Sequence, residues 1–189
     1  MTGSPSTTTA PSPPAGGSAG VSPERFRGVL ARHAAGVVVI TVADGGGPAG
    51  LTVTSFTSAS LRPPLVSCWV DERSETLPKL RSAGLFAVNI LSGGQPETAA
   101  RFAGRRADRF APPTRWRPGP YGLPVLDGIA AFLACRPHSI LKAGDHHLIL
   151  GLVVHAEALG RTDDPLLYHH GAYGRFLPAP SEPAAAHER

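Results

Sequence analysis

Cysteine and long hydrophobic runs are scarce in this 189-residue sequence, and each scarcity removes a class of protein. No uninterrupted apolar segment approaches the roughly 20 residues that a membrane helix needs, so we expect a soluble protein with no membrane partner. The two cysteines, Cys68 and Cys135, each lie in an apolar run typical of a strand. In a small reduced protein such residues are more often buried free thiols than disulfides or nucleophiles, so we base no function on them.

Runs of one charge are also missing. The formal net charge is +4, but the arginines are scattered, and no basic stretch alternates with aromatic residues as a nucleic-acid groove would. We therefore expect no nucleic-acid partner, whereas a mildly basic protein suits phosphorylated cofactors. The first twenty residues contain neither a basic start nor an apolar stretch, which argues against a signal peptide or transit sequence and predicts a cytoplasmic location.

Glycine and proline are abundant, with 22 and 20 residues, and they mark the ends of the folded region. The polar segment 1–21 and the Pro/Ala-rich segment 178–189 bury too little apolar surface to offset the entropy of ordering, so we predict disordered tails. One folded domain over 22–177 remains. A short amphipathic helix begins it, because Ser22 suits an N-cap and Pro23 suits the first helical position.

Strand signals dominate the rest of the domain. β-Branched residues flank a glycine-rich turn, and several apolar runs with short helices between them predict a mainly β barrel or sandwich rather than a doubly wound sheet. We expect strands at 37–43, 49–56, 65–70, 86–91, 130–138 and 146–159, and short helices at 76–82 and 96–103. The turn Gly45 to Gly47 is not predicted to bind phosphate, because such a loop leads into a helix and here Pro48 and a strand follow.

Hydroxyl side chains are unusually dense between Gly50 and Val70. They recur at Thr52, Thr54, Ser55, Thr57, Ser58 and Ser60. A strand that only fills a core does not need them, so some must face a polar ligand or water. An edge strand with a solvated Thr/Ser face explains the pattern equally well on physical grounds.

This segment resembles the flavin-binding strand and loop of the flavin reductase family, in which a glycine and small hydroxyl residues precede a Pro-Pro pair and a strand. Similar segments follow in the family's order over 24–176, namely AAGVVVITV, SETLPKLRSAGLFAVNILS, ETAARFAG, LPVLDGIAAFLAC, the Gly-Asp-His turn of AGDHHLILGLV, and DPLLYHHGAYGRF. Their order and spacing are specific. The resemblance implies a mainly β FMN-binding split barrel, six-stranded and Greek-key-like with short flanking helices, in a homodimer with the flavin at its interface.

The resemblance also implies the chemistry. A hydride passes from C4 of NADH or NADPH to N5 of FMN or FAD, and the protein contributes orientation and charge stabilisation rather than a nucleophile. The similarity is greatest to reductase components of two-component flavin-dependent monooxygenases, which supply reduced flavin to an oxygenase partner. Two alternatives stay open because fold does not fix function: an FMN-retaining oxidoreductase acting directly on a small organic substrate, and a non-catalytic flavin-binding module.

The candidate flavin-binding residues fall into three groups. An isoalloxazine needs donors at its polar edge, and its phosphate needs hydroxyls and a cation. Around the ring we place Thr52, Val53, Thr54, Ser55 and Ser58; at the phosphate Arg73, Ser74 and Thr76; and, by resemblance, near the flavin tail Asn89, Ser92 and Gln95. A helix cap at Ser74 and an ordinary polar turn around the last three residues are the alternative interpretations.

The triplet from Gly144 to His146 is the candidate nicotinamide site. We interpret His146 as a histidine at a buried edge that, by resemblance, faces the reactive side of the flavin and holds the nicotinamide. The alternative is a turn histidine paired with Asp145. Tyr173 could pack near the same face, or be an ordinary buried tyrosine. We predict no metal site, because strand geometry separates the histidines of the last third too widely.

Overall fold

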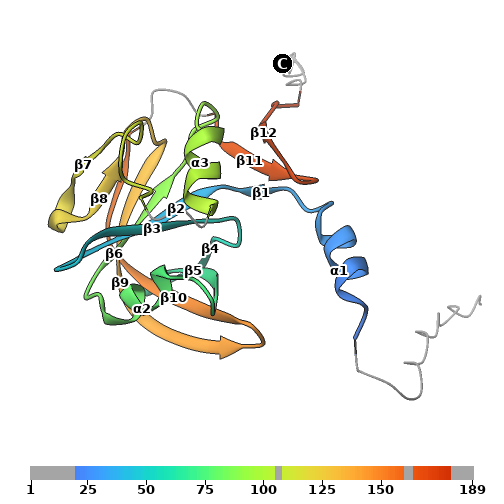
Figure 1. Cartoon of the computed structure of the whole chain (residues 1–189), viewed down its shortest axis with the longest axis horizontal. Coiled ribbons are helices and arrows are strands. Elements are labelled where there is room, and N and C mark those ends of the chain that lie inside the picture. Colours follow the sequence, from blue (N-terminus) through green and yellow to red (C-terminus); the bar gives the residue numbers. More distant parts are fainter. Residues whose placement is uncertain (1–19, 105–107, 160–163, 180–189) are drawn as a thin grey trace, which may run out of the picture.

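The computed structural model describes residues 20–104, 108–159 and 164–179. Most of the two segments predicted to be tails therefore lies outside the described residues. The fold is mainly β, as predicted, and three helices flank its sheets (Figure 1). No helix in these ranges is long and apolar enough to cross a membrane.

One large antiparallel sheet forms the body of the protein, with the strand order β3-β2-β6-β9-β10-β5-β4. Its strands are β2 (Val38–Asp44), β3 (Gly47–Val53), β4 (Thr57–Leu61), β5 (Pro64–Asp71), β6 (Phe86–Ile90), β9 (Ala131–Ala143) and β10 (His146–Ala158). The sheet has seven strands where we expected six. The chain leaves regular strand structure between Val53 and Thr57, so the hydroxyl-rich run makes two strands, one at each edge of the sheet.

Two small sheets complete the structure, and the sequence did not predict their strands. Strands of two to four residues carry too little periodicity to be recognised. The first sheet contains β1 (Ala35–Gly36), β11 (Leu166–His169) and β12 (Ala172–Arg175), and the second contains β7 (Trp116–Pro118) and β8 (Pro124–Leu126), joined by a 3-10 turn, η1 (Pro120–Gly122).

The three helices are α1 (Pro23–Leu30), α2 (Thr76–Ser82) and α3 (Pro96–Ala103). The predicted N-cap of α1 is confirmed, because the Ser22 hydroxyl accepts a hydrogen bond of 3.3 Å from the Arg25 amide. The predicted ranges of α2 and α3 are also confirmed, and both helices bury apolar residues against the large sheet. By contrast α1 projects away from the sheets (Figure 1), and none of its residues is buried.

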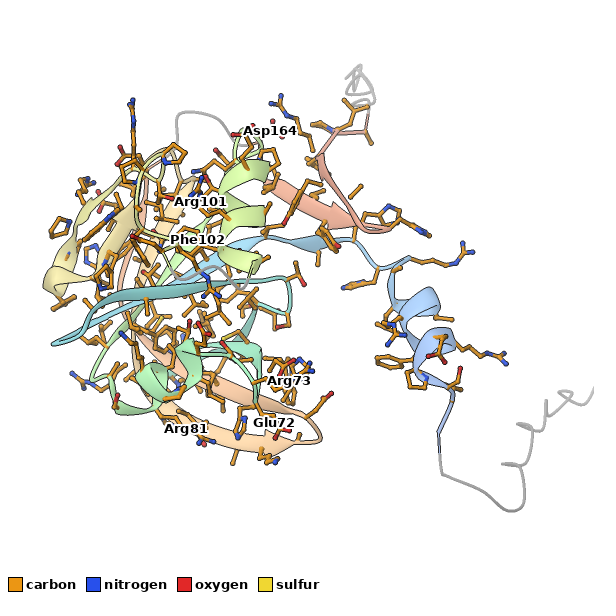
Figure 2. The ribbon with its side chains drawn as sticks, in the orientation of Figure 1. Glu72, Arg73, Arg81, Arg101, Phe102 and Asp164 are labelled. Carbon is orange, nitrogen blue, oxygen red and sulfur yellow. The ribbon has the colours of Figure 1, made fainter. Side chains whose placement is uncertain are left out.

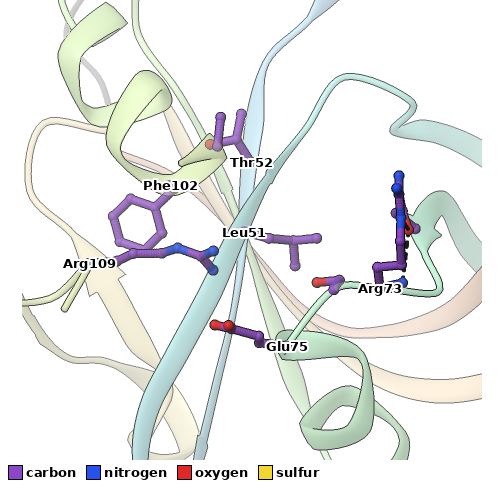
Figure 3. A pocket seen from close by; sticks show the side chains of 9 residues that line it. Leu51, Thr52, Arg73, Glu75, Phe102 and Arg109 are labelled. Atoms are coloured by element: carbon purple, nitrogen blue, oxygen red, sulfur yellow. Dashed lines mark hydrogen bonds and ion pairs between the residues drawn. The ribbon is translucent and has the colours of Figure 1, made fainter. Parts of the chain in front are cut away.

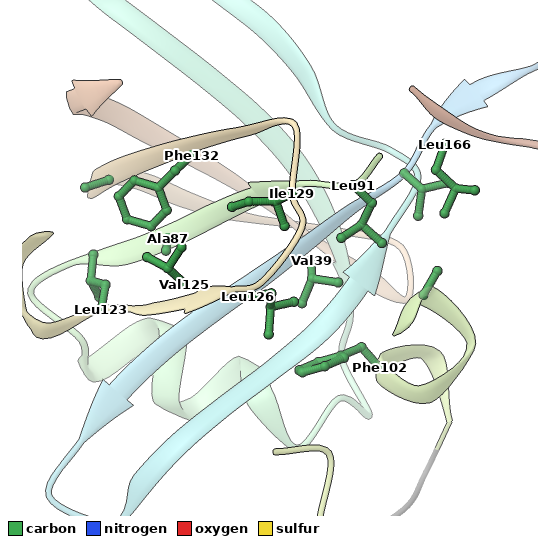
Figure 4. Close-up of a cluster of buried hydrophobic side chains, with 13 residues drawn as sticks. Val39, Ala87, Leu91, Phe102, Leu123, Val125, Leu126, Ile129, Phe132 and Leu166 are labelled. Atoms are coloured by element: carbon green, nitrogen blue, oxygen red, sulfur yellow. The ribbon is translucent and has the colours of Figure 1, made fainter. Parts of the chain in front are cut away.

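The core consists of two apolar clusters on the two faces of the central strands. One of them contains Val39, Ala87, Phe102, Phe132 and Leu166 (Figure 4). The other contains both cysteines, which are free and buried as predicted. Burial raises the pKa of both thiols to about 12. The glycine-rich turn is also confirmed as a hairpin, in which Asp44 pairs with Gly47 at a φ of 91°.

Candidate functional site

A cleft of about 310 Å³ lies between β3 and the turn that joins β5 to α2 (Figure 3). Its lining residues are Leu51, Thr52, Asp71, Arg73, Ser74, Glu75, Phe102, Ala103 and Arg109. The cleft joins two regions that are about twenty residues apart in the sequence. It therefore gathers Thr52 from the predicted ring group with Arg73 and Ser74 from the predicted phosphate group.

The cation predicted to hold phosphate, Arg73, is already paired. Its Nε and Nη2 atoms donate to the two carboxylate oxygens of Asp71 at 3.1 and 2.7 Å, and its backbone amide donates to the same carboxylate at 2.8 Å. These hydrogen bonds from Arg73 hold the pKa of Asp71 well below its usual range. The Arg73 side chain is 70% exposed, so the pair lies at the surface of the molecule (Figure 2).

The two hydroxyl residues beside Arg73 have different surroundings. Ser74 accepts a hydrogen bond of 3.3 Å from the Thr76 amide, but it does not cap α2 as its alternative role required, because Glu75 holds the N-cap position and makes no side-chain capping bond. Thr76 is 1% exposed, and its hydroxyl donates to the Gly50 carbonyl at 3.2 Å. Ser74 therefore reaches the cleft, whereas Thr76 links the start of α2 to β3.

The residues predicted to bind the flavin ring do not all line the same cleft. Thr52 lines the cleft and donates from its hydroxyl to the Ala99 carbonyl of α3 at 2.7 Å. Thr54 and Ser55 line a different cleft of about 490 Å³, which α1 and the turn at 169–171 border. The Ser55 hydroxyl accepts from the Trp69 amide at 2.9 Å, which fixes its position beside β5.

Two further ring candidates do not line either cleft. The Val53 side chain is 4% exposed and belongs to the core, so Val53 offers a ligand only its backbone. Ser58 lies exposed on edge strand β4, opposite Val66. That position fits the solvated strand face that we kept as the alternative interpretation.

Asn89 does not reach a cleft, and its assignment to the flavin tail needs correction. It is fully buried, and its amide donates to the Val39 carbonyl at 3.3 Å, the Thr41 hydroxyl at 3.1 Å and the Pro124 carbonyl at 3.4 Å. Its carbonyl accepts from the Leu126 amide at 2.9 Å. A buried amide with all these partners anchors β8 against β6 and has no atom left for a ligand.

The other two tail candidates also bind protein groups. Ser92 donates to the Gly128 carbonyl at 2.8 Å, and Gln95 donates to the Asp127 carbonyl at 2.8 Å. The Gln95 carbonyl in turn accepts from the Ser92 amide at 3.0 Å. These bonds fix the loop before α3 to the turn before β9, which is the ordinary polar-turn interpretation.

His146 is not among the residues that line the first cleft, and it does not lie at a buried edge. It begins β10 directly opposite Asp71, and its side chain is 41% exposed. Its Nδ1 atom lies 2.7 Å from a carboxylate oxygen of Asp145, which is itself 79% exposed. The hydrogen bond from His146 lowers the pKa of Asp145. A role toward the nicotinamide stays a prediction, and the pair with Asp145 that we kept as the alternative is present.

Tyr173 lies on β12, outside the first cleft. Its ring packs against Tyr168 with ring centroids 5.3 Å apart, and burial raises the pKa of its hydroxyl. Tyr168 lines the cleft beside Thr54 and Ser55, so Tyr173 packs against a residue that lines that cleft. Its position agrees with an ordinary, partly buried tyrosine.

Sequence reasoning missed Arg109, which lines the first cleft from the side opposite Arg73 (Figure 3). Its Nε and Nη2 atoms donate to the Gly104 carbonyl at 3.1 and 2.8 Å, and its Nη1 atom donates to the Gly50 carbonyl. The only available signal was the run of arginines after α3, and that run does not reveal which side chain turns inward.

Comparisons with known proteins identify the family of the chain. Residues 30–177 match the family model described as a flavin reductase like domain. The chain belongs to the flavin reductase family. Three relatives illustrate its range. An NADH:FMN oxidoreductase of Rhodococcus erythropolis is 40% identical over 168 residues, which cover 85% of each chain.

The second relative is the reductase subunit HsaB of a flavin-dependent monooxygenase from Rhodococcus jostii, 37% identical over 164 residues, covering 87% of this chain and 83% of that protein. The third is a solved structure, an NADH:FAD oxidoreductase of Streptomyces globisporus in complex with NAD and FAD fragments. It superimposes with a TM-score of 0.77 at 35% identity and covers 82% of this chain and 93% of that chain. The flavin reductase split-barrel fold is therefore confirmed.

Proposed function

We propose that this protein uses a reduced nicotinamide nucleotide to reduce FMN or FAD, and that the cleft between β3 and α2 holds the phosphate end of the flavin. The observation that carries the proposal is the gathering of Thr52, Arg73 and Ser74 around one cleft in a chain of the flavin reductase family. Its volume of about 310 Å³ is at the lower end of the usual range for small-molecule sites.

The lining residues fit a flavin nucleotide chemically. A bound flavin supplies the hydride acceptor, and the side chains supply orientation and charge. The Ser74 hydroxyl is placed to donate to phosphate oxygens, and the exposed Arg73 guanidinium adds positive charge at the mouth. His146, opposite Asp71, is placed to contact the nicotinamide at the rim.

The reduced flavin passes to a separate oxygenase. Support comes from the relatives, since HsaB is named as the reductase subunit of a flavin-dependent monooxygenase. The open rim of the cleft suits a flavin that enters and leaves. The nicotinamide substrate and the two free, buried cysteines both suit a reducing cytoplasm.

A second copy of the chain completes the site as a homodimer. The apolar side chains Phe26, Val29 and Leu30 of α1 are 57, 59 and 48% exposed. A helix of eight residues is too short to be stable on its own, so α1 needs a surface to pack against. The cleft beside Thr54 and Ser55 borders this helix, so burying α1 against a second copy would also enclose those hydroxyls.

Turnover with excess flavin tests the proposal. The protein, freed of flavin, should consume NADH or NADPH catalytically when FMN or FAD is in excess, and bind the flavin reversibly in a fluorescence titration. Protein that keeps its yellow flavin through purification, and that consumes only one equivalent of NADH per bound flavin as the colour bleaches, would instead indicate an FMN-retaining oxidoreductase. Binding without consumption would indicate a flavin-binding module.

Ser74→Ala tests the placement of the phosphate end. We expect a flavin Kd raised about 10- to 150-fold, since a hydrogen bond to a charged phosphate has a net contribution of about 1.5 to 3 kcal/mol, with kcat at saturating flavin little changed. Ser82→Ala is the matched control, because Ser82 lies at the other end of α2 and bonds only to the Pro78 and Lys79 carbonyls. Equal affinities in both variants would remove Ser74 from the site.

A further inference from the structure

One buried histidine takes no part in the site described above. His147 follows His146 on β10, and because successive strand residues face opposite sides of a sheet, its ring points to the face that α2 covers. His147 is 5% exposed. Its Nε2 atom lies 2.6 Å from Nη2 of Arg81, which is in the last turn of α2 (Figure 2). The pair therefore joins the end of α2 to β10.

Only a neutral histidine ring can form this pair. A guanidinium has N–H donors but no acceptor, and it stays charged throughout the pH range of proteins. Nε2 of His147 must therefore accept the hydrogen bond from Arg81, which places the proton of the neutral ring on Nδ1. That Nδ1 atom is buried and has no hydrogen-bond partner within the described residues. A protonated ring would direct a second N–H group, and a second positive charge, at Arg81.

The other charged groups around His147 do not neutralise such a charge. Lys142 of β9 lies directly opposite His147 and so on the same face, and its Nζ atom is 2.8 Å from a carboxylate oxygen of Glu72. Lys79 of α2 lines the cleft along β3 instead, and β5 offers this face only apolar side chains and a buried thiol. In the part of the chain that the structure describes, no carboxylate bonds to His147 or Arg81.

The other end of α2 forms a wall of the first cleft. Ser74 and Glu75, directly before the helix, line the cleft, and the Thr76 hydroxyl at the first helical residue donates to the Gly50 carbonyl of β3 at 3.2 Å. A helix of seven residues is too short to be stable on its own, so its position depends on the contacts at its two ends and on the leucines that it buries. Losing the contact at Arg81 therefore affects the residues that line the cleft.

We infer that Arg81 and His147 are positioning residues that hold α2 against β10 only while His147 is neutral, so that acidification weakens flavin binding. The inference rests on the proposed function and adds a regulation of the same site. Nδ1 keeps its proton, Nε2 takes up a proton from solvent, and the hydrogen bond from Arg81 breaks because Nε2 has no lone pair left to accept it. Arg81 is exposed and turns into water, whereas His147 stays charged beneath α2 until the helix moves.

The direction of the pH effect follows from where the proton binds. A histidine in an unfolded chain takes up a proton below about pH 6.5, whereas the intact pair leaves no place for one on Nε2. The unfolded chain therefore binds more protons than the folded protein, and stability falls as the pH falls. The flavin binds the form in which α2 is docked, so proton and flavin each weaken the binding of the other.

Titrations with FAD between about pH 8 and about pH 5.5 test the inference. FAD is the probe because its pyrophosphate keeps its charge over this range, whereas a terminal phosphate such as that of FMN takes up a proton near about pH 6. His147→Gln keeps a side-chain carbonyl that can accept from Arg81 but cannot be protonated. On acidification we expect the Kd of the wild type to rise about 5- to 50-fold more than that of His147→Gln.

Two further variants complete the test. His138→Gln is the matched control, because His138 lies exposed on β9 and its side chain makes no hydrogen bond within the described residues. Its pH dependence should equal that of the wild type. Arg81→Gln keeps an N–H donor for the neutral ring and removes the like charge, so its pH dependence should fall between those of the wild type and His147→Gln. If His147→Gln does not fold, Arg81→Gln decides, and a pH dependence equal to that of the wild type would overturn the inference.

Thermal melts of the same proteins separate regulation of the site from a purely structural role. Relative to His147→Gln, the unfolding equilibrium constant of the wild type should rise by up to about tenfold per pH unit below about pH 6.5. Melts that differ in this way, with FAD affinities that depend equally on pH in the two proteins, would make the pair structural and overturn the inference while the proposed function stands. A wild type that binds no FAD at about pH 8 would overturn both.

Discussion

Replacing Asn89 distinguishes a structural residue from a ligand contact. The buried amide donates to Val39, Thr41 and Pro124 and accepts from the Leu126 amide. Asn89→Ala leaves the Leu126 N–H buried without an acceptor, which costs about 1 to 3 kcal/mol, and opens a small cavity. We expect a total loss of about 3 kcal/mol in the free energy of unfolding.

The assay is a thermal melt read together with a flavin titration. For a chain of this size about 3 kcal/mol corresponds to a fall in Tm of roughly 6 to 12 °C. The Kd for flavin in the folded fraction should stay within about twofold of the wild-type value, because Asn89 does not line the cleft between β3 and α2.

Asn89→Leu is the companion variant. Leucine fills a similar volume but offers no acceptor to Leu126, so a similar fall in Tm attributes the loss to the missing hydrogen bonds rather than to the cavity. An unchanged Tm combined with weaker flavin binding would refute the structural role and restore Asn89 to the flavin site.

Two predictions concern the rim and the core. His146→Ala should leave the Tm nearly unchanged, because the pair that His146 makes with Asp145 is exposed. The variant should raise the KM for the nicotinamide or slow flavin reduction, measured by stopped flow, about 10- to 100-fold. Normal reduction kinetics would end the assignment of His146 to the nicotinamide. The buried thiols should make the protein less stable at alkaline pH. A thiol in the unfolded chain ionises near its ordinary pKa of 9.0, whereas Cys68 and Cys135 stay protonated up to about pH 12 in the folded protein. Between these two pH values each thiol therefore lowers the free energy of unfolding by about 1.4 kcal/mol per pH unit. Cys68→Ala should show a shallower fall of Tm between pH 9 and 10.5, and a slope equal to that of the wild type would contradict the burial argument.

The sequence predicted the regular elements well because they carry strong local signals. The start of α1 at Ser22 and Pro23 and the Gly45–Gly47 hairpin follow from capping and turn preferences that act within a few residues. The seven-stranded sheet was harder, because the division of the hydroxyl-rich run depends on which sheet edge each half joins. Local pattern contains no information about that choice.

Three residues that the sequence singled out line one cleft, namely Thr52, predicted at the flavin ring, and Arg73 and Ser74, predicted at the phosphate. Their roles toward a flavin stay predictions. Asn89 was misassigned because a polar residue at the end of a strand has the same signature whether it faces a ligand or a buried backbone group. Arg109 was missed because the sequence does not show which arginine after α3 turns toward the cleft.

The order of strands in the large sheet has a consequence for how the enzyme works. The sheet begins at β3 and ends at β4, and these two edge strands do not hydrogen-bond to each other. The first cleft lies between β3, which is one edge strand, and the end of β5, which pairs with the other edge strand, β4. A ligand in this cleft can bind and dissociate without breaking any hydrogen bond between strands. A bound flavin can thus exchange rapidly while the sheet stays intact, as a protein that hands reduced flavin to a partner requires.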